Sequence, residues 1–314
     1  MRPEVGENAV VTDRVRAACA SVAAGARSVR IDEGAIAAYA AGLPAAGELP
    51  PPDPATHFAE GDREARITFV VCLDAINFGS GWWPEIRKRP GHSGYFTIAA
   101  GLTESFRAIG PWSAHELIEV GAADLAAVTG QDPGLALMEQ YAASLRDVGE
   151  HVLADHGGRF EALVEAAHGS AVGLADLLAG WEAFADVSTY HGQPVPFYKR
   201  AQITAADLNR TGVAALHGQD RLTAFADNLV PHVLRVDGVL RLDSALATRI
   251  DAGELLVHGS PEEVELRACA VHAIELLSAV ARLSPAEIDG ILWNRGRDRR
   301  YKSIPRPRSR NTAY

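Results

Sequence analysis

Two short stretches of the chain combine charged side chains with aromatic or apolar neighbours. Residues 197–202 read FYKRAQ, so Lys199 and Arg200 follow two aromatic residues, and residues 222–233 read LTAFADNLVPHV, where Asp227 is the one acidic residue. Lysine is a compact positive charge and arginine a planar two-pronged donor, and both suit a phosphate group. A carboxylate near such cations could stabilise a cationic sugar and orient water, as cleavage of a glycosidic bond requires. Alternatively, the two cations form an exposed basic turn of a helix.

The surroundings of Asp227 leave two interpretations open. If residues 222–233 are helical, their apolar residues form a buried stripe, and Asp227 lies about 140° from Leu222 around the helix axis. A side chain in that position could simply be solvated. Pro231, however, cannot continue the ladder of backbone hydrogen bonds, so a kink or break there could turn nearby side chains toward a cavity.

A third stretch, LDAINFGSGWWP at residues 73–84, could line a pocket for a flat heterocycle. On a helix, Asp74 and Asn77 face the same way, and together they can accept and donate hydrogen bonds at the edge of a base. Phe78 and Trp82 could stack on its faces. The competing interpretation is a polar helix end followed by a turn and aromatic core residues.

Sequence patterns for metal or dinucleotide chemistry are missing. The segment from Ser113 to Glu119 resembles the start of a zinc-binding helix but lacks the second histidine of HExxH, and no Cys/His set has ligand spacing. There is no GxSxG, Walker or Rossmann pattern, and residues 79–81 (GSG) are too short to cradle a phosphate. We therefore expect neither a metal ion nor another cofactor.

Helices must position these side chains, because long stretches are rich in Ala, Leu, Glu and Arg. Residues 260–263 (SPEE) and 284–287 (SPAE) each combine an N-cap serine, a proline at the first helical position and a glutamate three residues after the cap. They predict helices over about 261–282 and from 285 to about Trp293, and residues 204–207 look like a weaker start. The predicted fold is mainly α, with at most a few short strands near 67–73 or 233–242.

Length, composition and charge bound the kind of protein. The proline-rich residues 43–56 suggest that residues 1–50 form an N-terminal helical segment beside a main helical domain over 51–314, packed as one unit. The net charge is −10, but residues 295–310 hold eight basic residues and one acid, a balance of +7, which leaves −17 on the remainder. Such a basic stretch indicates a nucleic-acid arm, a clamp for a small anion or a solvated tail, and the acidic remainder disfavours long polyanions.

Three scattered cysteines, Cys19, Cys72 and Cys269, argue against a disulfide framework. No apolar run is long enough to span a membrane, and the N-terminus lacks the pattern of a secretory signal. We therefore expect a cytoplasmic protein.

Several of these stretches, taken in order, resemble the queuosine salvage family. The matching blocks are LDAINFGSGWWP, FYKRAQ with its lead-in from Asp186, FADNLVPHVL, GSPEEVELRA and the terminal IPRPRSRNTAY, so the resemblance runs from about residue 68 to the last residue. Members of that family are queuosine 5′-phosphate N-glycosylases, which release the base queuine from the nucleotide for salvage into tRNA. The resemblance implies a largely helical fold similar to helix-hairpin-helix DNA glycosylases.

The resemblance also implies roles for individual residues. Lys199 and Asp227 would stand at the reaction centre, with the base held by Asp74, Asn77, Phe78 and Trp82. Candidates for the phosphate and ribose are Lys199, Arg200, Tyr198, His232, Arg308, Arg310 and Tyr314. The substrate would be queuosine 5′-monophosphate, or also queuosine, with no stable nucleic-acid complex.

This chain departs from the family pattern in three places, one of which is an extra Gly-Ser-Gly-like insertion in the aromatic block, at residues 79–81. Asn228, Leu229 and His232 stand where the family has tyrosine, arginine and glutamine, and Arg306-Pro307 replaces an aromatic residue and a histidine. Two other functions stay open from the sequence: a base-excision glycosylase acting on DNA or RNA, and a carrier that binds a modified nucleotide without hydrolysing it. A basic surface that tracks a nucleic-acid backbone would favour the first, and binding without base release the second.

Overall fold

The computed structural model describes residues 10–44 and 52–314, and within them the chain forms 15 α-helices and four short strands. The predicted mainly helical fold is confirmed. The helices are α1 (Val11–Gly25), α2 (Glu33–Ala41), α3 (Arg63–Ala75), α4 (Gly94–Ile109), α5 (Ala114–Glu119), α6 (Ala122–Thr129), α7 (Ala136–His156), α8 (Phe160–Ala166), α9 (Ala171–Leu178), α10 (Lys199–Arg210), α11 (Leu229–Val236), α12 (Ser244–Asp251), α13 (Pro261–Ala281), α14 (Pro285–Arg295) and α15 (Arg299–Lys302).

The strands form two small antiparallel pairs. β1 (Val29–Ile31) pairs with β4 (Leu240–Leu242), and β2 (Val187–Tyr190) pairs with β3 (Gln193–Pro196) as a hairpin. Neither pair is a large enough surface to organise a core, so helix packing builds the interior.

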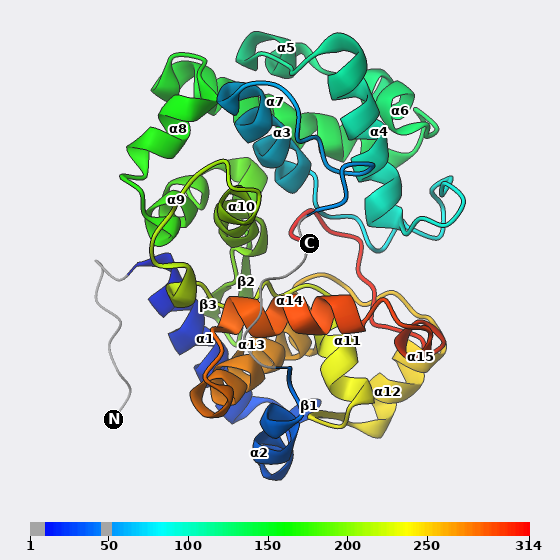
Figure 1. Cartoon of the computed structure of the whole chain (residues 1–314). Coiled ribbons are helices and arrows are strands. Elements are labelled where there is room, and N and C mark those ends of the chain that lie inside the picture. Colours follow the sequence, from blue (N-terminus) through cyan, green and yellow to red (C-terminus); the bar gives the residue numbers. More distant parts are fainter. Residues whose placement is uncertain (1–9, 45–51) are drawn as a thin grey trace.

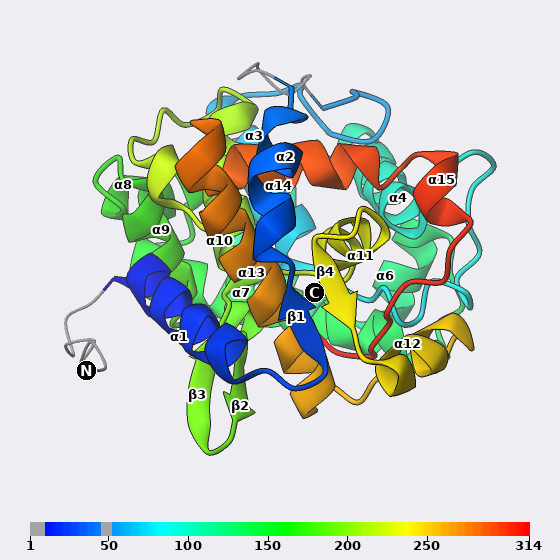
Figure 2. The same cartoon turned by 90° about the horizontal axis from the view of Figure 1, so that it is seen from below.

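The helices gather in two groups, with the last residues of the chain between them (Figure 1). Helices α3 to α8 lie in the upper part of the view, and α1, α2 and α11 to α15 lie in the lower part. After α15, the chain turns back and ends between the two groups. Figure 2 shows α13 running between α1 and the β1–β4 pair, and it packs against all of them.

The two strongest sequence signals for helix starts are confirmed. The Ser260 side chain accepts from the N–H of Glu263 at the start of α13, and Ser284 and Glu287 form a capping box at the start of α14. The stripe expected on α13, from Val264 to Leu277, is buried. Local capping and a 3.6-residue pattern were sufficient to predict these helices.

Two weaker expectations about secondary structure are wrong. Residues 67–73 belong to α3, whose start is capped by the Asp62 side chain. The prediction failed because a fully buried apolar run looks the same in sequence for a helix and for a strand. Residues 204–207 lie inside α10 rather than at a helix start. The alternative strand region, 233–242, does contain β4 at its end.

The N-terminal segment is bound to the rest of the chain through Glu265 on α13. One oxygen of this buried carboxylate accepts from the backbone N–H groups of Arg27 (3.0 Å), Ser28 (2.7 Å) and Val29 (3.1 Å), and the other accepts from the Tyr190 hydroxyl (2.7 Å). The predicted boundary at residues 50 and 51 lies outside the described residues. Among the described residues, no helix is both long and apolar enough to cross a membrane.

Candidate functional site

Lys199 is the first residue of α10, and its side chain is buried. Tyr198 before it has a left-handed backbone conformation (φ 50°), which turns the chain from β3 into the helix. The Lys199 backbone N–H donates to Asp186 Oδ2 (3.1 Å), and Nζ donates to the carbonyl oxygen of Asn77 (2.9 Å). The ammonium group therefore lies against the segment that follows α3.

Asp227 lies in an irregular segment just before α11, so of the two interpretations left open by the sequence, a continuous helix over residues 222–233 does not apply. Asp227 Oδ1 accepts from the backbone N–H groups of Leu229 (2.7 Å) and Val230 (3.0 Å) and so satisfies two free donors at the helix start. Pro231 is the third residue of α11, where an N–H would have no partner within the helix, so it fits without breaking the ladder.

The second oxygen of the Asp227 carboxylate, Oδ2, is the one that is available to contact a ligand. The side chain is partly exposed, and Oδ2 makes no hydrogen bond to any residue that the structure describes. Because Oδ1 is fixed by two N–H groups, the carboxylate has a defined orientation.

A third ionisable group, Asp289 on α14, lies near Asp227 and Lys199. It is 4% exposed, and its Oδ1 accepts from the backbone N–H of Phe225 (3.0 Å), in the segment leading to Asp227. Burial, together with the charge of Asp227, raises the pKa of Asp289 well above its ordinary value. Burial lowers the pKa of Lys199, whereas the carboxylates of Asp227 and Asp74 oppose that shift.

Sequence reasoning missed Asp289, although a signal existed. On the predicted helix, Asp289 falls on the face that buries Pro285, Ile288 and Leu292. A carboxylate among apolar residues on one helix face is costly unless it is bonded or used, so its place in the pattern could have identified it.

A buried arginine joins the segments that carry Lys199 and Asp227. Arg267 on α13 is 1% exposed and pairs with both oxygens of Asp186 (Nη1–Oδ1 2.9 Å, Nη2–Oδ2 2.7 Å). Its Nε donates to the carbonyl oxygen of Ala226 (3.0 Å), the residue before Asp227. Asp186 in turn accepts from the Lys199 N–H, so one guanidinium fixes the backbone on both sides of the site.

The same guanidinium also contacts the end of the chain. It lies over the rings of Phe197 (3.9 Å) and Tyr314 (4.5 Å), and the Tyr314 hydroxyl donates to Glu263 (2.8 Å). The Tyr314 carbonyl oxygen accepts from the Gly79 N–H (3.1 Å). Tyr314 therefore links α13 to the loop of the third sequence stretch.

Of the residues expected to hold a base, Asp74 has a buried oxygen without a partner in the described part of the chain, whereas the two aromatic residues are packed into the protein. Asp74 on α3 is 1% exposed, accepts from Asn77 Nδ2 at 3.4 Å, and has a buried Oδ2 without a partner among the described residues. Burial raises its pKa well above the ordinary value, and Lys199 opposes the shift. Phe78, by contrast, packs edge-on against Tyr141 (4.9 Å), and Trp82 is buried.

The residues expected to bind a phosphate are mostly engaged by the protein itself. The buried Arg200 guanidinium donates to the Ala75 carbonyl oxygen, and burial lowers its pKa to about 10. The Tyr198 ring lies beneath the Arg14 guanidinium (5.6 Å), and His232 Nε2 is bonded to the Tyr301 carbonyl oxygen (2.9 Å). Arg308 donates to the Gly253 carbonyl oxygen (3.0 Å), and Arg310 pairs with Glu85. Tyr314 makes the contacts given above. None of these contacts is made with Asp227.

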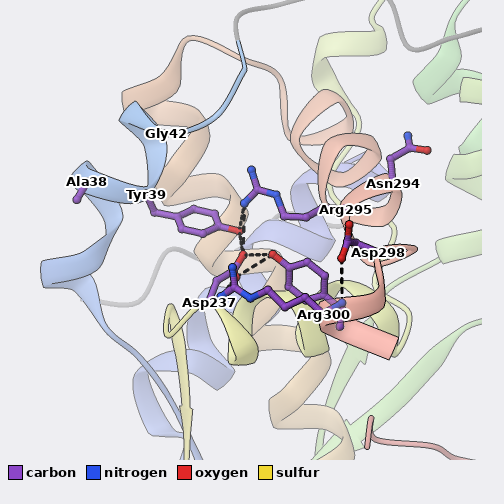
Figure 3. Close-up of a pocket in the computed structure, with 9 residues that line it drawn as sticks. Ala38, Tyr39, Gly42, Asp237, Asn294, Arg295, Asp298 and Arg300 are labelled. Atoms are coloured by element: carbon purple, nitrogen blue, oxygen red, sulfur yellow. Dashed lines mark hydrogen bonds and ion pairs between the residues drawn. The ribbon is translucent and has the colours of Figure 1, made fainter. Parts of the chain in front are cut away.

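A cavity of about 710 Å³, with lining residues that Figure 3 draws as sticks, is lined mainly by residues of α2, α14 and α15, and neither Asp227 nor Lys199 lines it. Its centre is Asp237, which accepts from the hydroxyls of Tyr39 (2.7 Å) and Tyr301 (2.9 Å) and pairs with Arg295 (3.3 Å) and Arg300 (3.1 Å). Because these groups satisfy one another, the cluster ties α2, α11, α14 and α15 together. In the described part of the chain, no group of three or more His, Cys, Asp or Glu side chains could hold a metal ion.

The fold and site define a mainly helical protein with a buried lysine, Lys199, whose charge interacts with the partly exposed Asp227 and with the buried carboxyl groups of Asp74 and Asp289. The chain belongs to the queuosine salvage protein family, whose model matches residues 56–314. The resemblance seen in the sequence is thus confirmed.

Relatives in three organisms carry the name queuosine 5′-phosphate N-glycosylase/hydrolase. The protein from Sphaerobacter thermophilus is 34% identical over 306 residues, which cover 92% of this chain and 94% of the relative. The Mus musculus protein is 28% identical over 284 residues, with 81% and 83% covered. The Schizosaccharomyces pombe protein is 32% identical over 168 residues, with 51% and 49% covered.

Proposed function

We propose that this protein is an N-glycosylase that hydrolyses queuosine 5′-phosphate and releases the base queuine. The names of the relatives support this substrate, and two of those relatives match more than four fifths of their length. One observation carries the proposal: the Asp227 carboxylate is fixed at the start of α11, has one oxygen without a hydrogen bond to any described residue, and has Lys199 close by. This arrangement suits a reaction that develops positive charge on a sugar.

In the proposed reaction, the bond between the sugar carbon C1′ and the base breaks, and its electron pair leaves with the base. Queuine is a 7-deazapurine, so it lacks the ring nitrogen at which purine leaving groups are often protonated. Stabilising the cationic sugar therefore contributes more to catalysis than protonating the leaving base. Asp227 Oδ2 would face C1′ and guide water to it, after which hydroxyl remains on the sugar and the base carries a proton.

Asp74 and Lys199 would bind the substrate around this centre. Because burial raises the pKa of Asp74, its carboxyl can carry a proton, so it can both donate and accept at the edge of the base. Lys199 Nζ, between Asn77 and the carboxylates, would hold oxygens of the ribose. Asn77 and Trp82 remain proposed as walls of the base pocket.

The decisive experiment compares Asp227→Asn with the wild type in a single-turnover assay on queuosine 5′-phosphate. The amide can still accept from Leu229 and Val230 but carries no negative charge, so base release should slow at least about 10²–10³-fold while nucleotide binding persists. Asp220→Asn, an exposed acid seven residues earlier, is the matched control. Near-normal release by Asp227→Asn would refute the role of the carboxylate.

The same assay separates the other candidate functions. A carrier would bind the nucleotide without releasing base even as the wild type. A base-excision enzyme would bind duplex DNA with a steep dependence on salt. The −17 balance outside the basic stretch supports a free nucleotide as substrate, and the buried free thiols of the three cysteines support the cytoplasm as its location.

A further inference from the structure

Arg306 reaches the neighbourhood of Asp227 because the last segment of the chain packs along α11. Asn228 Nδ2 donates to the Pro307 carbonyl oxygen (2.8 Å), and Arg235 Nη1 donates to that of Pro305 (3.4 Å). The Arg306 guanidinium between them lies over the Trp83 ring at 5.5 Å. It therefore stands between the Asp227 segment and the loop after α3.

Arg306 is a half-buried cation without a fixed partner. It makes no hydrogen bond or ion pair with any residue in the ranges 10–44 and 52–314, whereas Arg300, Arg308 and Arg310 in the same stretch each have one. Burial lowers its pKa, the charge of Asp227 opposes the shift, and Arg308 adds to it. A partly desolvated charge is costly unless something compensates it, and among the described residues Arg306 has the longer-range attraction of Asp227 but no bonded anion.

A second cation, Lys88, lies close enough to Arg306 for the two charges to interact. Lys88, in the loop after Trp83, is exposed, and its pKa is lowered by slight burial and by the charge of Arg306. Two cations that repel each other at one place, with no carboxylate bonded to either among the described residues, fit an anion that arrives from outside.

We propose that Arg306, together with Lys88, binds the 5′-phosphate of the nucleotide whose glycosidic bond lies at Asp227. The planar guanidinium can make a two-pronged contact with phosphate oxygens, and the lysine adds a point charge. This inference rests on the proposed function. It moves the phosphate away from Arg200, Arg308 and Arg310, which the protein itself engages.

The test measures kcat/KM of Arg306→Gln on queuosine 5′-phosphate and on queuosine, the nucleoside without phosphate. Loss of a charge-assisted contact should lower kcat/KM on the nucleotide on the order of 10- to 100-fold and leave the nucleoside unchanged. Arg306→Lys, which keeps the charge but not the fork, should lie between. Arg299→Gln removes the same charge at an exposed position of the same stretch and should change neither.

Equal losses on both substrates would overturn the inference, because Arg306 would then act on Asp227 rather than on phosphate. No loss on the nucleotide would overturn it as well. If the wild type releases base from neither substrate, the proposed function fails, and calorimetric binding of the nucleotide decides the inference separately. Weaker binding of the nucleotide to Arg306→Gln than to Arg299→Gln would then support the phosphate role of Arg306, and equal binding would refute it.

Discussion

At the scale of single residues, the site is built from ionisable groups that the fold keeps out of water. Lys199 and Asp289 are both buried, and Asp227 alone is partly exposed. Burial favours the neutral form of each group, so it lowers the pKa of Lys199 and raises the pKa of Asp289. Such opposed shifts are common where side chains act on a substrate, and they cost stability.

Asp289→Asn should raise stability, and the gain should increase with pH. A carboxyl whose pKa is raised in the folded state binds more protons there than in the unfolded chain, so wild-type stability falls as pH rises above about 3.9. The amide does not titrate, and its oxygen can still accept from Phe225. Thermal unfolding at several pH values checks this, with the exposed Asp155→Asn as control. If the difference in melting temperature between the variant and the wild type does not change with pH, the pKa of Asp289 is not raised in the folded protein.

At the scale of elements, Arg267 holds together segments that approach the site from different directions. Asp186 precedes β2, Ala226 precedes Asp227, and Lys199 opens α10, and all three are bonded within one buried network. A buried pair of this kind contributes little net stability compared with apolar packing, but it fixes geometry. Its position suggests that it sets the distance between Lys199 and Asp227.

Arg267→Lys should therefore lower kcat more than it changes KM. The lysine keeps the charge but cannot bond both oxygens of Asp186 and the Ala226 carbonyl, which should cost about 1–3 kcal/mol of unfolding free energy. A displacement of about 1 Å at Asp227 could lower kcat on the order of 10²-fold. Steady-state kinetics at a temperature where the variant is folded would measure this.

Arg295→Lys gives the matched control for that experiment. It alters another arginine paired with a buried carboxylate, Asp237, in the cluster of Figure 3, away from Asp227. It should lose stability without a fall in kcat. If the two variants lose kcat in proportion to their stability, Arg267 has only a structural role.

At the scale of the whole molecule, residues 27–31 of the N-terminal segment are hydrogen-bonded to the main part of the chain. The family match begins at residue 56, yet Glu265 inside it binds the backbone of residues 27–29, and β1 pairs with β4. Tyr39 on α2 also joins the Asp237 cluster. We therefore expect that the main domain does not reach its full stability without the first 44 residues.

Glu265→Gln should destabilise the protein by about 1.5–3 kcal/mol, because charged hydrogen bonds to three backbone N–H groups are weakened. Urea unfolding gives the value, and hydrogen exchange should speed up at residues 27–29. Glu262→Gln on the same helix removes only a surface pair with Arg249 and should cost no more than about 1 kcal/mol. Unchanged exchange at residues 27–29 in Glu265→Gln would show that the segment is held elsewhere.

Local patterns determined what the sequence alone could predict. The helical class, the starts of α13 and α14 and the buried stripe of α13 depend on residues a few positions apart, which the sequence displays directly. The family resemblance likewise followed from ordered short blocks, and it singled out Lys199 and Asp227.

Only the tertiary structure decided where those side chains lie and which partners they have. Asp289 reaches the Asp227 segment across 64 positions, Arg267 reaches Asp186 across 81, and Asn228 holds the backbone beside Arg306 across 79. The same folding turns the Arg200 guanidinium toward the Ala75 carbonyl oxygen. Helical periodicity describes one element at a time, whereas a charge is placed by burial and by partners that distant elements supply.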